Sequence, residues 1–210
     1  MAKLTLEQLE AKYDKLYEYE RKAFADGYKV IGGIDEAGRG PLAGPVVAAC
    51  CVLDPEVKIL GLDDSKKLSE KKREALFDEI RDKALGFEIA VIGPDVIDEI
   101  NILEATKMAM RQCVDKIETK PDLLLVDAVK LDCNVPVIPI IKGDAKSDSI
   151  AAASILAKVT RDRIMVQYGG EYPQYGFEKH KGYGTRDHYK AIREYGITPI
   201  HRRTFLKVIH

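Results

Sequence analysis

The chain has 210 residues, of which 46% are hydrophobic, and its 33 basic side chains nearly balance 34 acidic ones. This length suits one domain with room for an appendage. The net charge of −1 does not mark a nucleic-acid-binding protein, although a carboxylate cluster can mask basic groups that gather elsewhere. No apolar run reaches the ~18 residues of a membrane span, and the N-terminus lacks the apolar stretch of a signal peptide. Four cysteines without a C-x-x-C pair indicate reduced core residues of a cytoplasmic protein rather than zinc ligands or disulfides.

Residues 5–26 are predicted to form one helix that ends at Gly27. The apolar positions recur at helical spacing, at Leu6, Leu9, Tyr13 and Leu16, and the other face is dense in Glu and Lys. We expect residues 1–28 to be an N-terminal helical extension and residues 29–210 to be the main domain. The extension either packs on the domain or acts as an arm that touches a ligand.

A strand is expected over residues 29–35, and it delivers two adjacent carboxylates, Asp35 and Glu36, at its tip. A buried carboxylate without a partner is costly, so this pattern favours a functional site over the alternative, a solvated turn after an edge strand. Neighbouring strand residues face opposite ways. The two carboxylates therefore converge only if the strand ends or bulges between them, which the following glycines allow.

Two phosphate-binding loops are excluded for this glycine-rich stretch. Residues 38–43 match the spacing of the dinucleotide fingerprint, but that motif must open a helix, and the apolar run 46–53 is typical of a buried central strand. Gly33 and Gly38 have the spacing of a Walker A loop, yet Arg39-Gly40 stands where Lys-Ser/Thr is required.

The remaining chain alternates helices and strands. In order, we expect helix 69–84, strand 86–92, a short helix from Pro94, helix 102–117, strand 122–127, strand 135–141, helix 148–167, a Gly/Tyr-rich loop 168–184, helix 185–195 and a basic tail 201–203. Allowing for extra helices, this order is three strands followed by helix–strand–helix–strand–helix.

Four carboxylates lie at or just past the ends of predicted strands: Asp35, Glu36, Asp127 and Asp144. Oxygen ligands without histidine or cysteine select hard cations, so Mg²⁺ or Mn²⁺ rather than zinc. Two such ions ~3.5–4 Å apart can activate a water and stabilise the leaving oxygen of a phosphodiester. The other acids considered are interpreted as caps or surface charges: Asp63, Asp64, Asp132 and Asp148.

Basic side chains could hold phosphates, although each alone is more often a solvated surface charge. They are Lys66, Lys67, Lys142, Lys158, Lys179, Lys181, Arg202 and Arg203. Arg39 is the strongest of the basic groups because it lies between two glycines of the carboxylate loop. Tyr183 is interpreted as a loop tyrosine, and His180 and His188 are expected to pack or lie at the surface rather than transfer protons.

Residues 35–49 resemble the signature segment of type 2 ribonucleases H, specifically bacterial ribonuclease HII. Further matching blocks are residues 64–68, 126–127, 142–144, 152–162 and 180–185, so the resemblance spans roughly residues 29–206. It implies an α/β ribonuclease H-like fold, with a mixed five-stranded sheet flanked by helices. The extension 1–28 is too short to be the separate N-terminal domain of the related ribonuclease HIII group.

The resemblance also implies a function. It maps the family's catalytic, metal-binding acids onto Asp35, Glu36, Asp127 and Asp144, one by one. The backbone of Gly38, Arg39 and Gly40 would approach the ribose 2′-OH, and Tyr183 would pack on the neighbouring sugar, with Lys66 and Lys181 as further substrate contacts.

The implied protein is an endoribonuclease dependent on Mg²⁺ or Mn²⁺. It would cut the RNA strand of RNA/DNA hybrids, and duplex DNA 5′ of embedded ribonucleotides, leaving 3′-hydroxyl and 5′-phosphate ends. Other replication or repair proteins are candidate partners. Two alternatives stay open: a junction resolvase or integrase of the same fold, which needs no 2′-OH, and a catalytically silent hybrid-binding module.

Overall fold

The computed structural model describes residues 5–206 and centres on a mixed five-stranded sheet of order β3-β2-β1-β4-β5. The central strand β1 (Ile31–Ala37) runs antiparallel to β2 (Val46–Val52), which in turn pairs antiparallel with β3 (Gly86–Ile92). On its other side β1 is parallel to β4 (Leu123–Asp127), and β4 is parallel to β5 (Val137–Ile140). The predicted mixed sheet is confirmed.

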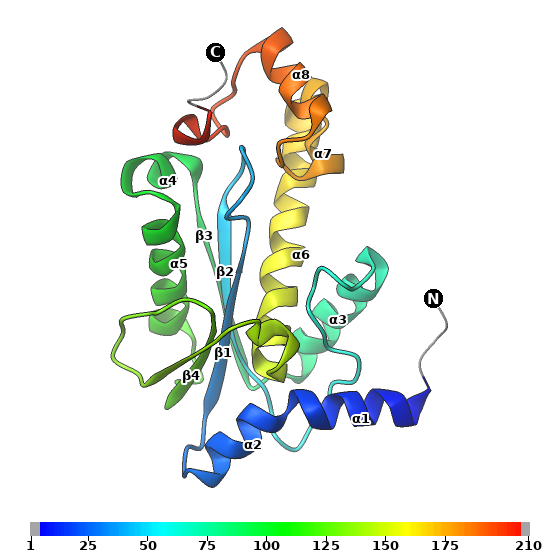
Figure 1. Ribbon diagram of the computed structural model, residues 1–210, viewed down its shortest axis with the longest axis vertical. Helices are drawn as coiled ribbons and strands as arrows, with labels where there is room; N and C mark the ends of the chain where they lie inside the picture. Colours follow the sequence, from blue (N-terminus) through cyan, green and yellow to red (C-terminus); the bar gives the residue numbers. More distant parts are fainter. Residues whose placement is uncertain (1–4, 207–210) are drawn as a thin grey trace.

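Helices cover both faces of the sheet. The helices α4 (Pro94–Ile100) and α5 (Ile102–Lys116) lie on one side, and α3 (Glu70–Lys83) and α6 (Asp148–Glu171) lie on the other (Figure 1). Strand β2 is buried along its whole length, because its alternate residues enter two separate cores, one under α5 and one under α6. This explains the unbroken apolar run that predicted a central strand. Cys50, Cys51 and Cys113 are buried free thiols, as expected for core cysteines.

The N-terminal segment differs from the single predicted helix. It forms α1 (Leu6–Leu16) and α2 (Glu18–Ala25), which meet at Tyr17 with ψ near 7°. The buried positions of both helices still follow helical spacing, so the sequence pattern stays continuous across the break. The Tyr17 ring stacks on Tyr13 and also meets Phe24, so aromatic packing accompanies the bend. The division into residues 1–28 and 29–210 stays a prediction, and its outermost residues, 1–4 and 207–210, lie outside the described part.

Strand β1 does not end at Asp35. The pairing with β2 continues without a bulge, Asp35 opposite Ala49 and Glu36 opposite Ala48, up to Ala37. The strand therefore neither ends nor bulges between the two carboxylates, which was the condition for them to converge, because regular pairing with β2 keeps both residues in extended backbone. Asp35 and Glu36 consequently start from opposite faces of the sheet.

The expected order of elements also needs two corrections. No helix separates β4 from β5 within the described residues, where a loop over 128–136 makes the parallel connection instead. The helix α6 runs four residues past its predicted end, and the predicted loop 168–184 contains the 3-10 helix η2 (Pro173–Tyr175) and α7 (Phe177–His180). The other predicted helices and strands agree with the structure within one or two residues.

Residues 172–206 form what we call the C-terminal cap. It contains η2, α7, α8 (Arg186–Tyr195) and the 3-10 helix η3 (Arg203–Phe205), and it lies beyond the end of the sheet where β1 turns into β2 (Figure 1). Its apolar residues pack on Leu42, Ala43 and Met165. The cap therefore faces the glycine-rich loop that follows Glu36. Among residues 5–206, no helix is both long and apolar enough to cross a membrane.

Candidate active site

Three carboxylates meet at the carboxyl ends of β1 and β4. Asp35 and Asp127 share the α6 face of the sheet with Ile31, Leu123 and Leu125, which pack on Ile150, and Asp144 comes from the 3-10 helix η1 (Gly143–Ala145) just after β5. One oxygen from each lies within 4.8 Å of the other two. We call Asp35, Asp127 and Asp144 the carboxylate cluster. Parallel β1 and β4 bring the first two together because their carboxyl ends lie at the same edge of the sheet.

Backbone amides partly support the cluster. The N–H of Gly143 donates to Asp127 Oδ1 at 2.7 Å, and the N–H of Glu36 donates to Asp35 Oδ1 at 2.7 Å. Burial, reinforced by the charges of Glu36 and Asp127, raises the pKa of Asp35 well above its ordinary value. Burial and the nearby Asp64 and Asp127 raise the pKa of Asp144 to about 6. The cluster therefore gathers more negative charge than its protein surroundings neutralise.

Glu36 lies beside this cluster rather than within it. Its Oε1 is 3.5 Å from Arg39 Nη1, while its Oε2 is buried without a hydrogen-bond partner in the described chain. Burial raises the pKa of Glu36, which the charge of Arg39 only partly offsets. An orphaned buried carboxylate oxygen next to three crowded carboxylates fits a cation better than any group the protein itself offers. The site therefore fits hard divalent ions, with Glu36 at its border.

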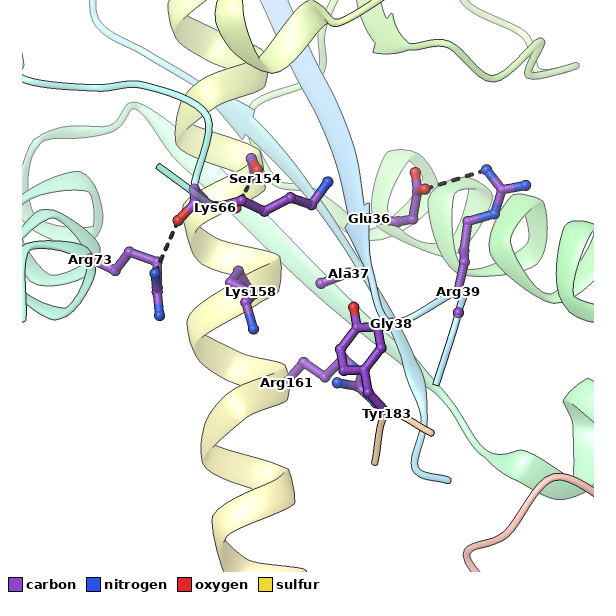
Figure 2. A pocket seen from close by; sticks show the side chains of 12 residues that line it. Glu36, Ala37, Gly38, Arg39, Lys66, Arg73, Ser154, Lys158, Arg161 and Tyr183 are labelled. Atoms are coloured by element: carbon purple, nitrogen blue, oxygen red, sulfur yellow. Dashed lines mark hydrogen bonds and ion pairs between the residues drawn. The ribbon is translucent and has the colours of Figure 1, made fainter. Parts of the chain in front are cut away.

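A cavity of about 430 Å³ opens beside the acids and is drawn in Figure 2. Its walls come from the end of β1 and the start of the following loop (Glu36 to Gly40), from Ser65, Lys66 and Arg73, from Ser154, Lys158 and Arg161 of α6, and from Tyr183. A second hollow is lined by Asp127, Asp144 and Lys66. Because Lys66 lines both, the carboxylate cluster and the cavity are adjoining parts of one cleft.

Two buried arginines hold the loop that forms one wall of this cavity. Arg161 Nε donates to the carbonyl of Pro45 at 3.0 Å, and its Nη2 donates to that of Ala43 at 3.2 Å. Arg202 donates to the carbonyls of Gly44, Arg39 and Gly38 at 2.9, 2.9 and 2.6 Å. Within residues 5–206 neither guanidinium has a carboxylate partner, and burial lowers the pKa of Arg161 to about 10 and of Arg202 to about 9.

The arginines determine which side of the loop backbone faces the cavity. With the carbonyls of Gly38 and Arg39 turned inward to Arg202, the opposite side of this backbone is left for a ligand. Gly38 has φ of +97°, and a Cβ there would lie 2.0 Å from Arg161 Nε. Only glycine allows this backbone angle and this approach together. The sequence block 152–162 contains Arg161, but nothing in the pattern singles it out from other basic residues.

Known proteins similar to this chain belong to one group of nucleases. The family model described as Ribonuclease HII matches residues 32–208. The chain belongs to the ribonuclease HII family. It is 56% identical over 206 residues to ribonuclease HII of Acetivibrio thermocellus, covering 98% of this chain and 80% of the relative, and 55% identical over 201 residues to that of Clostridioides difficile, covering 95% and 79%.

Solved structures of the ribonuclease HII group share the fold. The crystal structure of ribonuclease H2 from Pyrococcus horikoshii aligns with a TM-score of 0.73 at 31% identity, covering 84% of this chain and 93% of that chain. The ribonuclease HII of a complex with PCNA from Archaeoglobus fulgidus aligns with a TM-score of 0.73 at 28% identity, covering 83% and 94%. The predicted ribonuclease H-like fold and the predicted enzyme class, a type 2 ribonuclease H, are therefore confirmed.

Several predicted substrate contacts of this ribonuclease HII line the cavity. Tyr183 is 45% exposed there, beside the Gly38–Gly40 loop, where a Cβ at Gly40 would lie 3.7 Å from Cε1 of the tyrosine, and Lys66 points into the cavity (Figure 2). Partial burial opposes the charge of Lys66, but Asp35, Asp64 and Asp144 together raise its pKa. Lys158 also lines the cavity, where it bonds Asp162 at 2.6 and 2.7 Å.

Other predicted basic contacts lie elsewhere. The ammonium of Lys181 donates to the carbonyl of Glu178 rather than into the cavity, so its substrate role stays a prediction. Arg202 is fully buried on the loop carbonyls, so it is neither the solvated surface charge nor the phosphate contact that the sequence left open for it. His188 is also fully buried, in agreement with its expected packing role.

Two acids outside the predicted four occupy unexpected positions. Asp64 Oδ1 accepts from the N–H of Lys66 at 2.9 Å, as a cap does, but its carboxyl also lies close enough to Asp144 to raise that group's pKa. The prediction that Asp148 is a cap or surface charge is wrong, since it is only 2% exposed, beside the buried Glu20 of α2. The folding of α2 onto the start of α6 buries it, which no local pattern reveals.

Proposed function

We propose that this ribonuclease HII cuts both the RNA strand of RNA/DNA hybrids and duplex DNA on the 5′ side of a single embedded ribonucleotide. The observation that carries the proposal is the single cleft in which the carboxylate cluster adjoins the Gly38–Gly40 loop and Tyr183. The carboxylate cluster suits the phosphodiester that is cut, and the Gly38–Gly40 loop with Tyr183 suits the sugar next to it.

The acids are proposed to hold two divalent ions, with Mg²⁺ or Mn²⁺ as the candidates. Asp35, Asp127 and Asp144 would be shared ligands, and Glu36 would turn its unpartnered Oε2 toward the same site. Such ions supply an activated water and charge stabilisation at the leaving oxygen. In hydrolysis the water oxygen bonds to phosphorus while the bond to the 3′ oxygen of the preceding nucleotide breaks, which leaves a 3′-hydroxyl and a 5′-phosphate.

The residues around the acids are proposed to select RNA over DNA. The backbone of Gly38, Arg39 and Gly40, held from behind by Arg202, would meet the 2′-OH, the group that DNA lacks. Tyr183, beside that loop, would pack on the adjoining sugar, and Lys66, which lines both hollows of the cleft, would bind a phosphate. Other replication or repair proteins stay proposed partners, supported only by the complex that the Archaeoglobus relative forms with PCNA.

Three matched substrates test this proposal: a duplex DNA with one ribonucleotide, its all-DNA twin, and a full RNA/DNA hybrid of the same sequence. We expect Mg²⁺- or Mn²⁺-dependent cutting of the first and third, with one incision 5′ of the single ribonucleotide, and none of the twin. Ligation of the products reports a 3′-hydroxyl and a 5′-phosphate. Cutting of the all-DNA twin would favour a resolvase-like nuclease, and tight hybrid binding without cutting would favour a silent binding module.

A further inference from the structure

The turn that carries Tyr183 has an unusual backbone. Lys181 and Gly182, the two residues before the tyrosine, both adopt left-handed angles, with φ of +52° and +83°. A Cβ at Gly182 would lie 2.4 Å from the carbonyl oxygen of Ala43, so this segment presses against the loop after β1. Tyr183 is 45% exposed, and the Arg161 guanidinium lies 6.0 Å from its ring centroid (Figure 2). The backbone behind the ring, rather than packing around it, therefore sets where Tyr183 lies.

Three histidines stand directly behind this turn, and we call His180, His188 and His201 the histidine cluster. The rings of His180 and His188 stack 4.5 Å apart with an interplanar angle of 17°. The ring centroid of His201 is 5.2 Å from that of His188, and Phe177 contacts all three rings. His188 is 0% exposed and His201 is 2% exposed. Two of these imidazoles therefore have no access to water and must find partners in the protein.

The hydrogen bonds of His201 and His188 can run in only one direction. The backbone N–H of Thr198 donates to Nδ1 of His201 at 2.9 Å, and the Thr198 hydroxyl lies 2.8 Å from the same nitrogen. The backbone N–H can only donate, so it requires Nδ1 to be an acceptor, and a neutral His201 carries its proton on Nε2. That Nε2 is 3.1 Å from Nε2 of His188, which must then accept. The proton of His188 is consequently on Nδ1, which lies 2.9 Å from the carbonyl oxygen of Tyr183. The N–H of Thr198 can only donate and the carbonyl of Tyr183 can only accept, and both require the same pair of tautomers.

We propose that His201 and His188 are positioning residues that hold Tyr183 at the sugar-binding wall of the cleft through this one-directional hydrogen-bond chain. The inference rests on the proposed function, in which Tyr183 contacts substrate. His180 supports the same turn from its other side, because its Nδ1 accepts from the N–H of Gly182 at 3.2 Å and its carbonyl accepts from the N–H of Tyr183 at 2.9 Å. The turn is thereby tied on both sides of the tyrosine.

The chain works only while both imidazoles are neutral. A proton added to either ring would place two N–H groups opposite each other at the 3.1 Å contact. No carboxylate in the described part of the chain ion-pairs with these rings, and the titratable groups that face them are His180 and Tyr175. Burial lowers the pKa of His188 and of His201 to about 4, consistent with a chain that is intact at neutral pH.

The first test reads the tautomers directly in the wild-type protein, without any activity measurement. In ¹⁵N-histidine-labelled protein at pH 7, NMR should find His188 protonated on Nδ1 alone, and His201 and His180 protonated on Nε2 alone. Signals are assigned in the wild-type protein, by through-bond correlation of each ring nitrogen with its own ring protons and by NOEs from those protons to neighbouring residues. Detection of His188 as the Nε2–H tautomer, or as a cation, would overturn the proposed chain even if every variant below failed to fold.

The second test asks whether His188 acts through Tyr183. His188→Leu keeps an apolar side chain in the buried site but removes the donor, whereas His188→Asn places an amide N–H near the position of Nδ1. We expect His188→Leu to lower kcat/KM about tenfold on the duplex with one ribonucleotide, the effect expected for Tyr183→Ala. His188→Asn should recover most of that loss, although both variants lower the melting temperature. In a Tyr183→Ala background, His188→Leu should have no further effect.

The outcomes separate the inference from the function on which it rests. Equal losses for His188→Leu and His188→Asn, or a full additional loss in the Tyr183→Ala background, would show that His188 only fills space. A wild-type enzyme that ignores the single ribonucleotide would refute the proposed function and leave the tautomer result standing on its own.

Discussion

The carboxylate cluster and the C-terminal cap both bury ionisable side chains, yet they handle charge in opposite ways. Asp35, Asp127 and Asp144 are pressed together with few donors, and burial raises the pKa of Asp35 and of Asp144. In the cap, and at Arg161 of the neighbouring helix α6, the buried basic groups find partners in the protein, and burial lowers the pKa of Arg161, Arg202, His188 and His201.

The difference indicates what each region is for. The carboxylates receive only a few backbone donors, which fits the proposal that an external cation is their partner and that this region favours binding at the expense of stability. The arginines are satisfied by loop carbonyls, and the histidines by backbone groups and by one another, so the cap, together with Arg161 of α6, holds the shape of the loop at residues 38–45 and of the turn at Tyr183. The following variants probe that contrast from the largest expected effect to the smallest.

Replacing Asp35 with Asn should abolish turnover while the protein stays folded. It removes one charge from the carboxylate cluster, so it takes away a proposed ion ligand and also relieves repulsion. We expect kcat/KM to fall by about 10³-fold or more on the single-ribonucleotide duplex. The melting temperature without divalent ions should be unchanged or higher. Activity near wild type with Mg²⁺ present would remove Asp35 from the site.

Replacing Arg202 with Ala should instead cause a large loss of stability, in contrast to Asp35→Asn, which should lose activity and keep its stability. Three carbonyls of the loop would lose their donor, and a fully buried side chain would leave a cavity. We expect the free energy of unfolding to fall by about 3 kcal/mol in urea denaturation. The neighbouring Arg203 is exposed, so Arg203→Ala is the matched control, expected within about 0.5 kcal/mol of wild type. Equal stability of the two variants would contradict the holding role of Arg202.

Replacing Tyr183 should affect catalysis without affecting stability, because its ring is exposed at the cleft. A ring packed on a nucleic-acid unit contributes ~1–3 kcal/mol, so Tyr183→Ala should lose about tenfold in cleavage of the single-ribonucleotide duplex. Tyr183→Phe should lose less, because the ring face makes the contact. Wild-type cleavage by Tyr183→Ala would refute the substrate role, and a large drop in melting temperature would point to packing instead.

In the metal-free protein, acidification should change the free energy of unfolding in opposite directions through the two regions. The pKa of His188 and of His201 falls from 6.5 to about 4 on folding, so the stability present above pH 6.5 is lost as the pH drops toward 4. The pKa of Asp144 rises from 3.8 to about 6 on folding, so the folded state takes up this proton first and gains stability over the same fall.

The Asp144→Asn variant isolates the contribution of Asp144 to the pH dependence of stability, which is the smaller of the two. Between pH 7 and pH 4 its free energy of unfolding should fall more steeply than that of wild type, by about 1 kcal/mol after screening by solvent is allowed for. Urea denaturation across this pH range, with chelator present, measures the difference. Parallel curves for the two proteins would show that Asp144 ionises normally in the fold.

The sequence by itself determined most elements and the candidate acids. Hydrophobic periodicity is a local property, so it located β2, α3 and α5 within a residue or two. A carboxylate at the end of an apolar strand is also a local signal, which is why the sequence alone singles out Asp35 and Asp127. The motif blocks then indicated the family and, through it, the substrate class.

Only the tertiary structure decided what pairs with what. The pairing of β1 with β2 placed Glu36 on the face opposite Asp35, and docking of α2 on α6 buried Asp148, because both depend on segments far away in the sequence. Arg202 reaches Gly38 across 164 positions, and His201 reaches His188 only through the fold of the cap. A basic or imidazole side chain has the same local pattern whether it binds a ligand or holds the backbone. Burial and hydrogen-bond partners distinguish the two roles, and both arise only when the chain has folded.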